Sequence, residues 1–347
     1  MATTPTVNVV TFSDFVRLAP IVWEDAIKTV QYDARTSGIF QDGTFAYNSG
    51  NTEEFSEFDT NEYAKKKAPG DTAAQSKIQI GYSKIGRTYR VAEDCGIDWE
   101  TRNQGKYPEA IKRITALARK TASRMEIDLA HRLTFMTATS YTDMDGETVD
   151  TTVGDGFQLA YTAHTLKGTS TLYRNRLAGN PQLSRGSLEA MEKQIIENTL
   201  NQFGEKMTID FNILWTTDDP NTINTTRELL QSTASVSAPN AGVLNVYQAK
   251  YKHVVLRRVA TTATGAVDST KAKCWGLVSS EASSAYLKVL EEPTMREPSD
   301  ISLQRALGST NMEDVSTDTI TYSGRACYMI CVSGARWIHA STGDLTA

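Results

Sequence analysis

A long, uninterrupted helical pattern runs from Tyr107 to Met136. Pro108 suits the first turn of a helix, where its missing N–H would be unpaired anyway, and no later Gly or Pro interrupts the run. We therefore predict a helix of about 29 residues and roughly 43 Å, long enough to span a whole domain. Its apolar positions recur at spacings of three and four residues and form one stripe: Ile111, Ile114, Ala118, Ala122, Met125, Leu129, Leu133 and Met136.

The remaining surface of this helix is basic. Its positive residues are Lys112, Arg113, Arg119, Lys120, Arg124 and Arg132, opposed by Glu109, Glu126 and Asp128. Three interpretations stay open, namely a solvated face, contact with an acidic neighbouring subunit, and contact with packaged nucleic acid.

The segment before the helix, Glu53 to Ala92, has the pattern of a long β-hairpin. Phe55, Phe58 and Tyr63 lie in the first arm, residues 68–71 supply a turn, and the return arm alternates. Arms of about 14 to 17 residues reach about 45–55 Å, whereas a chain of this length has a radius of gyration near 20 Å. Either the hairpin folds back as ordinary sheet or another molecule covers it, because an isolated hairpin is marginal in water.

The hairpin and the helix are opposite in charge. The first arm carries an acidic cluster of Glu53, Glu54, Glu57, Asp59 and Glu62. We expect one subunit's hairpin to lie across another subunit's helix, and we expect removal of 53–92 to leave a folded core that no longer assembles. The predicted interface residues are Glu53, Glu54, Phe55, Glu57, Phe58, Lys65, Lys66, Lys67, Arg113, Arg119, Lys120 and Arg124.

The whole chain of 347 residues has an ordinary composition for a soluble globular protein, with 40% hydrophobic and 22% charged residues. Its start lacks the features of a secretory signal, and no run is apolar enough to cross a membrane. A net charge of −5 argues against a dedicated nucleic-acid binder. The cysteines are expected to be reduced and mostly buried: Cys95, Cys274, Cys327 and Cys331.

The other segments predict an α+β chain. An amphipathic piece at 15–32 is either a first helix or an arm over neighbours, and 38–50 is expected to be a loop. Residues 137–156 predict a loop or small hairpin, in which Asp143 and Asp145 are more consistent with a solvated turn than with calcium binding. Later helices are expected at 184–203 and after 218–221, with strands at 207–215, 253–259, 274–278, 285–290 and 320–332.

Patterns for catalysis are weak. The four histidines, His131, His164, His253 and His339, stand in no metal-binding spacing, and there is no phosphate-binding loop or nucleophile elbow. Carboxylates that converge only in space remain an alternative, and with them a soluble hydrolase. We expect no enzyme and no cofactor.

The order of these elements resembles the major capsid protein of tailed bacteriophages, the Hong Kong 97-type fold. The strings that look like its Mu-like major head subunit subgroup are 85–94, 113–135, 157–166 and 183–191. The resemblance implies an N-terminal arm at 1–51 and an extended loop at 52–92. It also implies a peripheral domain at 93–203 and 313–347, which carries the spine helix 107–136, and an axial domain at 204–312.

The resemblance further implies a shell subunit that forms pentamers and hexamers around double-stranded DNA, assembled in the host cytoplasm and found in the virion. Implied partners are copies of itself, portal and decoration proteins, and packaged DNA by non-specific contact, with no membrane. Some relatives carry a preceding scaffolding segment that this chain has no room for, so assembly would use a separate scaffold or none. A bacterial nanocompartment shell is the alternative, and covalent crosslinking through Lys65, Lys66 or Lys67 is not expected.

Overall fold

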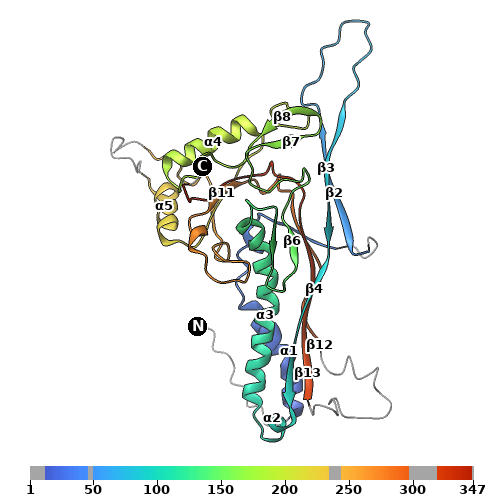
Figure 1. Ribbon diagram of the computed structural model, residues 1–347, viewed down its shortest axis with the longest axis vertical. Coiled ribbons are helices and arrows are strands. Elements are labelled where there is room, and N and C mark those ends of the chain that lie inside the picture. Colours follow the sequence, from blue (N-terminus) through green and yellow to red (C-terminus); the bar gives the residue numbers. More distant parts are fainter. Residues whose placement is uncertain (1–11, 46–49, 234–243, 297–318, 346–347) are drawn as a thin grey trace.

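Helix α3 (Tyr107–Thr134) forms the axis of an elongated molecule in the computed structural model (Figure 1). The structure describes residues 12–45, 50–233, 244–296 and 319–345. The helix has 28 residues and Pro108 in its first turn, as predicted. Of its predicted stripe, Ile114 to Met136 are buried and Ile111 is partly buried. The spine helix expected from the spacing of apolar residues is therefore confirmed.

A long four-stranded sheet lies along one side of α3, in the order β1-β12-β13-β4. Its strands are β1 (Gln41–Thr44), β12 (Ala285–Arg296), β13 (Thr319–Val332) and β4 (Tyr89–Asp98). β1 runs parallel to β12, and the other neighbours are antiparallel. β13 thus returns to the long helix, as its sequence predicted.

Helix α1 (Phe12–Lys28) packs against α3, so that this stretch is a first helix within its own chain. Its buried side chains are Phe15, Ala19, Trp23 and Ala26. Ile21 of the same helix is 56% exposed and lies outside this packed face. Residues 1–11, part of the expected N-terminal arm, lie outside the described residues.

A second sheet, β10-β9-β11-β14, covers the other end of α3. Its strands are β10 (Lys252–Val255), β9 (Ile213–Thr216), β11 (Trp275–Val278) and β14 (Ile338–Ser341). Helices α4 (Arg185–Asn198) and α5 (Pro220–Gln231) pack on it. Ser184 and Asp219 cap these two helices.

The remaining elements are short, apart from one hairpin. β2 (Thr52–Thr60) and β3 (Ile78–Arg87) form the long hairpin, while β5 (Ser140–Thr142) with β6 (Thr148–Asp150) and β7 (His164–Leu166) with β8 (Thr169–Tyr173) form small ones. α2 (Trp99–Asn103) and two 3-10 turns, η1 (Arg35–Ser37) and η4 (Ser269–Lys271), complete the described elements. No helix in the described ranges is long and apolar enough to cross a membrane.

Four expectations of local structure were wrong in detail. The stretch 38–50 contains strand β1, because its backbone pairs with the edge of β12. The helix begun at Ser184 ends at Asn198, where the side chains of Asn198 and Thr199 bond the carbonyls of Gln194 and Ile195. The strand at 207–215 is only β9, whose four residues are all buried rather than alternating. Residues 89–92, expected in the hairpin, lie in β4 beside β13.

Two cores meet on α3. Its first half packs with α1, β4 and β13 around Ile114 and Tyr322, and its second half packs between the two sheets around Leu129 and Trp337. A third cluster joins α4 and α5 to the second sheet. One helix therefore holds both ends of the molecule together.

Candidate assembly surface

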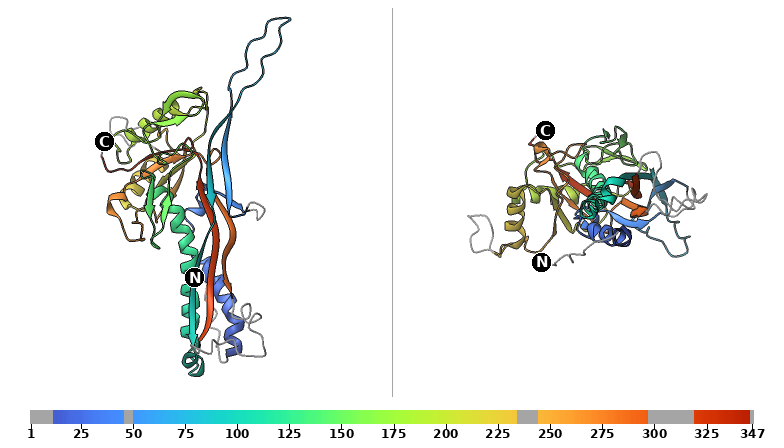
Figure 2. Two further views of the ribbon diagram at one scale, coloured as in Figure 1. Left: turned by 45° about the vertical axis from the view of Figure 1, so that its right-hand side comes forward. Right: turned by 90° about the horizontal axis from the view of Figure 1, so that it is seen from below.

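The hairpin β2–β3 leaves the body as a continuation of the long sheet, and its tip reaches beyond the rest of the described chain (Figures 1 and 2). Its arms pair from Thr52 with Arg87 to Thr60 with Ile78, with one irregularity after Ser56. Residues 61–77 form the tip. The root and the tip of this hairpin differ in burial, in ion pairing and in packing against the body.

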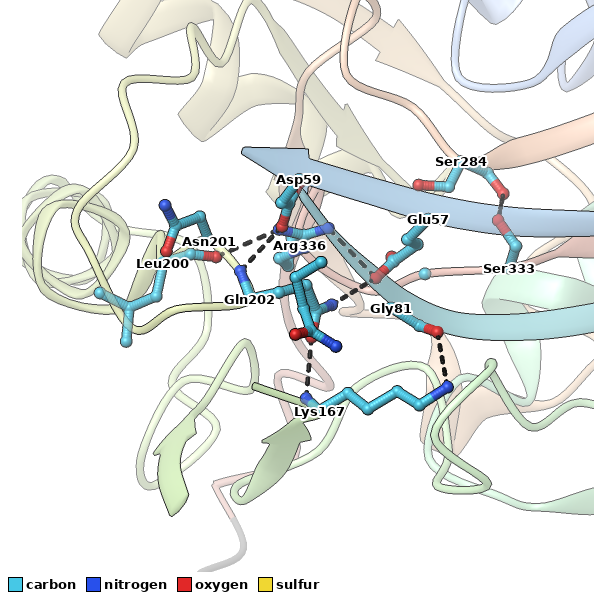
Figure 3. A network of polar contacts seen from close by, with 12 residues as sticks. Glu57, Asp59, Gly81, Lys167, Leu200, Asn201, Gln202, Ser284, Ser333 and Arg336 are labelled. Atoms are coloured by element: carbon cyan, nitrogen blue, oxygen red, sulfur yellow. Dashed lines mark hydrogen bonds and ion pairs between the residues drawn. The ribbon is translucent and has the colours of Figure 1, made fainter. Parts of the chain in front are cut away.

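Arg336 fastens the root to the body (Figure 3). Its guanidinium lies 3.1 Å from Glu57 Oε2 and 2.5 Å from Asp59 Oδ2. Its Nη1 also donates to the carbonyl of Leu200 at 3.3 Å. The three charged side chains are only 10–13% exposed, so that Glu57 and Asp59 are both neutralised within their own chain.

The turn after α4 adds a second fastening. The Gln202 backbone N–H donates to Asp59 and its side-chain amide donates to Glu57, each at 2.8 Å. Lys167 joins this group, because its backbone N–H donates to Gln202 Oε1 and its ammonium donates to the carbonyl of Gly81 (Figure 3). Each carboxylate therefore has both an ionic and an amide partner, which a buried charge requires.

Burial and the neighbouring charges shift the pKa values of Glu57 and Arg336. It raises the pKa of Glu57, against the lowering effect of Arg336. Burial would lower the pKa of Arg336, yet Glu57 and Asp59 raise it overall. The arginine is thus held in its charged form, and the root depends on it.

Glycine allows the close approach at the root. A Cβ on Gly334 would lie 2.0 Å from Glu57 Oε1, and one on Gly81 would lie 2.8 Å from the Gln202 amide nitrogen. Real Cβ atoms do not come this near to other heavy atoms. A larger residue at either position would therefore require the Glu57 or Gln202 side chain to move.

The two faces of the hairpin differ in apolar burial. Phe55 stacks on Tyr286 of β12, with ring centroids 4.3 Å apart and planes 15° apart. On the outer side, Phe58 is opposite Ile80 in the ladder, and these residues are 67% and 54% exposed. Ile78, next along the same face, is 70% exposed. Nothing in the described chain covers this outer apolar strip of Phe58, Ile78 and Ile80.

The tip carries the three predicted lysines, Lys65, Lys66 and Lys67. Every residue from 62 to 78 is exposed. The described contacts of the tip are few: Asn61 bonds to Tyr63, Ser76 and Lys77, the Asp71 N–H donates to the carbonyl of Ala68, and the Glu62 N–H donates to the Glu205 carboxylate. The body therefore leaves the conformation of the tip almost undetermined.

The predicted basic residues of α3 are mostly paired within the chain. Arg113 pairs with Glu109 at 3.0 Å, and Lys120 pairs with Glu93 at 2.5 Å. Arg119 donates to the Thr29 hydroxyl. Acidic partners inside the same subunit therefore pair with Arg113 and Lys120. On the hairpin, Glu57 and Asp59 are paired as well, whereas no ion pair among the described residues involves Glu53, Glu54 or Glu62.

Arg124 is the most enclosed of these bases. It is 12% exposed and pairs with Asp128, Asp143 and Asp145 at 2.8–3.1 Å. Burial would lower the pKa of Arg124, but these carboxylates raise it overall. Asp143 also accepts the backbone N–H groups of Asp145 and Glu147, which makes the β5–β6 turn a solvated acidic loop on a buried arginine.

The polar pair His164 and Asp155 is the nearest approach to a catalytic arrangement. His164 Nδ1 lies 2.7 Å from Asp155 Oδ2, and both side chains are buried. Tyr161 and Tyr173 enclose the imidazole, and the hollow beside Asp155 holds only about 10 Å³. The four cysteines are free thiols, and the described residues contain no group of three or more His, Cys, Asp or Glu arranged to hold a metal.

The structure thus gathers Glu57 and Asp59 of the predicted acidic cluster around a residue that the sequence did not single out. Arg336 lies 277 residues after Asp59, and no local pattern links the two. Gln202 was assigned to a helix, although it lies in the turn beyond that helix. The only available signal was the short string Ser333-Gly-Ala-Arg336, in which glycine indicates a close approach.

Comparison with known proteins gives likenesses of fold alone. No family model and no curated protein sequence matches the chain. The chain is similar to the capsid of Myoviridae phage XM1, with 11% identity, a TM-score of 0.49, and 89% of this chain and 90% of that one covered. It is also similar to the capsid structure of cyanophage P-SCSP1u, with 11% identity, a TM-score of 0.46, and 87% and 85% covered.

A third likeness is to the virus-like particle from Pyrococcus furiosus, with 9% identity, a TM-score of 0.43, and 94% of this chain and 99% of that one covered. The α+β class predicted from the sequence is confirmed by the sheets and helices described above.

Proposed function

We propose that this protein is a major capsid protein, which assembles with copies of itself into pentamers and hexamers of an icosahedral shell around the double-stranded DNA of a tailed phage. The observation that carries the proposal is the hairpin with a fastened root and an unsupported tip. Fixing an extended arm to a rigid body while leaving its tip uncovered gains nothing for a monomer. The same arm gains contact area when a second subunit lies under it.

The mechanism of such a shell needs no catalytic residue. Each arm adds a modest contact, and a closed shell repeats that contact many times, so that the whole is far more stable than one interface. The outer apolar strip on the hairpin is a candidate part of that contact. Portal, decoration and scaffolding proteins remain proposed partners, and assembly in the host cytoplasm and residence in the virion follow from the proposal.

The part of the hairpin that shell formation needs is narrower than 53–92. Deleting that whole range would remove Glu57 and Asp59 from Arg336 and take the start of β4 out of the long sheet. A cleaner variant replaces residues 61–77 with Asn-Gly, a two-residue connection that suits the antiparallel pair Thr60 and Ile78.

The experiment compares this shortened variant with the natural chain by gel filtration and negative-stain electron microscopy. We expect closed shells or ring-shaped capsomers from the natural chain, and a folded but unassembled subunit from the shortened one. Phe58→Ser should weaken assembly in the same direction, whereas Val267→Ser, which changes an even more exposed apolar residue away from the hairpin, should not. A natural chain that stays monomeric at all concentrations would refute the proposal.

The cargo distinguishes the phage shell from a nanocompartment. Particles from the natural source should yield nuclease-resistant double-stranded DNA. Particles that hold a defined protein and no DNA would instead support the nanocompartment shell.

A further inference from the structure

The return strand of the hairpin, β3, has a clamp of its own. Lys84 is 15% exposed, and its ammonium donates to Asp150 Oδ2 at 2.7 Å, to the carbonyl of Thr152 at 2.5 Å and to the Thr152 hydroxyl at 2.9 Å. An ammonium has three N–H donors, so each of them can reach an acceptor. Asp150 ends β6, and its carbonyl accepts a hydrogen bond from Arg132 of α3. This Lys84 clamp therefore ties the arm to the spine helix through β6.

A further contact holds β3 two residues closer to the tip. The Tyr82 hydroxyl lies 2.9 Å from the Thr165 hydroxyl of β7. Gly154 permits the approach, because a Cβ there would lie 2.8 Å from the Ser333 carbonyl oxygen and 3.0 Å from Tyr82 Cβ. Side chains of the body thus hold β3 directly, in addition to its ladder with β2.

The strand changes partner where the arm leaves the long sheet. β3 ends at Arg87 in its ladder with β2, whereas β4 begins at Tyr89 in its ladder with β13. Thr88 belongs to no pair of either ladder. A hollow of about 550 Å³ lies at this junction and is lined by residues 84–89, by β6 and by the end of β13. Packing under the junction is therefore incomplete, and the angle of the arm depends on its clamps.

The two clamps act at different points along the arm. Lys84 is opposite Phe55 in the ladder, and Asp59, which Arg336 binds, lies four residues closer to the tip than Phe55. Four residues of strand span about 13 Å. A single fixed point would let the arm pivot, whereas two points separated in this way define its direction.

The length of the arm magnifies any change of angle at its root. The tip, residues 61–77, extends about 28 Å beyond Asp59 when its two sides are extended. A pivot of about 10° would move the end of the tip by about 5 Å, which is the spacing between neighbouring strands of a sheet. A loose root would therefore change the place at which the tip meets another subunit.

We propose that the Lys84 clamp and the Arg336 clamp together set the direction of the arm in the free subunit, and that this direction fixes the curvature and diameter of the shell. A shell closes only if neighbouring subunits meet at consistent angles. An arm fixed before assembly supplies such an angle, whereas a pivoting arm would permit several angles and several diameters. This inference rests on the proposed self-assembly and adds what determines the size of the particle.

The first test loosens the Lys84 clamp from each side. Lys84→Met and Asp150→Asn should still form shells, but they should widen the spread of diameters in negative-stain electron microscopy about threefold, because the closing angle is no longer fixed. Both variants remove the same contact, so the double variant should spread no further than either one alone. Lys77→Met is the matched control, since Lys77 lies on the same hairpin, is exposed and belongs to neither clamp. It should keep a single diameter.

The second test keeps both clamps intact and covers the case in which a clamp variant does not fold. Nitroxide labels are placed on Thr60 and Lys193, which are both exposed, through an unnatural amino acid that avoids the native cysteines. Electron–electron double resonance then measures the distance from the arm to α4. The distribution should be as narrow in the unassembled subunit as in shells diluted with unlabelled subunits, because a pre-organised surface changes little on association.

The outcomes separate this inference from the proposed function. Shells of one diameter from both Lys84→Met and Asp150→Asn, or an equal spread from Lys77→Met, would overturn the clamps as the determinant of shell size. A distance distribution that becomes narrow only in the shell would overturn them as well. Each of these results would leave the shell protein standing, whereas a natural chain that forms no shells under any condition would overturn both.

Discussion

The root and the tip of one hairpin show two ways in which a chain uses the same strand pair. At the root, Glu57 and Asp59 share a buried arginine, Phe55 stacks on Tyr286, and glycine permits close contact. At the tip, residues 62–78 are all exposed. Contacts within the same chain fix the conformation of the root. The tip has few such contacts, so its surface is available to another molecule. Substitutions should therefore affect folding at the root and association at the tip.

The largest effect is expected from Arg336→Ala. It leaves two buried carboxylates without their cation, which typically costs about 3–5 kcal/mol of unfolding free energy. Urea unfolding followed by tryptophan fluorescence measures the loss. The matched variant Lys66→Ala removes one cation from the tip and should leave the unfolding midpoint unchanged. Equal losses in the two variants would erase the distinction between root and tip.

A smaller loss is expected from Gly334→Ala. The added methyl would meet the Glu57 carboxylate at 2.0 Å, and such overpacking usually costs about 1–3 kcal/mol. Gly186→Ala is the matched control, since a Cβ there meets nothing within 4 Å. Thermal unfolding should separate the two, and a Gly334→Ala protein as stable as the Gly186→Ala control would show that the root can relax freely.

The smallest effect concerns pH. Burial raises the pKa of Glu57 above its unfolded value near 4.5, so the folded chain binds more protons than the unfolded one between these two values. The contribution of Glu57 to stability is therefore greatest below pH 4.5 and falls as pH rises through that window. Glu57→Gln should flatten the pH dependence of the unfolding free energy there, while Glu62→Gln at the tip should not. The same slope in all three proteins would contradict this account.

The parts of the fold that could be predicted are those that local patterns encode. The spacing from Ile111 to Met136 defined α3, and α4 begins where the helix at 184–203 was expected to begin. Strand β1 was missed because its four residues, Gln-Asp-Gly-Thr, have no apolar alternation and depend on the edge of β12.

The site was less predictable than the fold. Opposite charges in the acidic arm and the basic helix indicated a contact between them, but the ion pairs of Asp59 and Arg124 lie elsewhere in the same chain, one far away in sequence and one a single helical turn away. Asp59 pairs with Arg336, and Arg124 pairs with Asp128 and Asp143. Charge composition shows which residues need partners, and only the three-dimensional arrangement determines which partners they meet.

The central position of β13 has a consequence for the order of events during synthesis. Tyr328 of this strand bonds to Asp128 of α3, 200 residues earlier, and residues 319–328 of β13 pair with the whole of β4. A ribosome must therefore release the hairpin and the spine helix long before the strand that completes their sheet. Until β13 is released, β4 has no neighbouring strand on either side. We therefore expect chaperones that bind nascent β-strands to stay on this segment for the longest time.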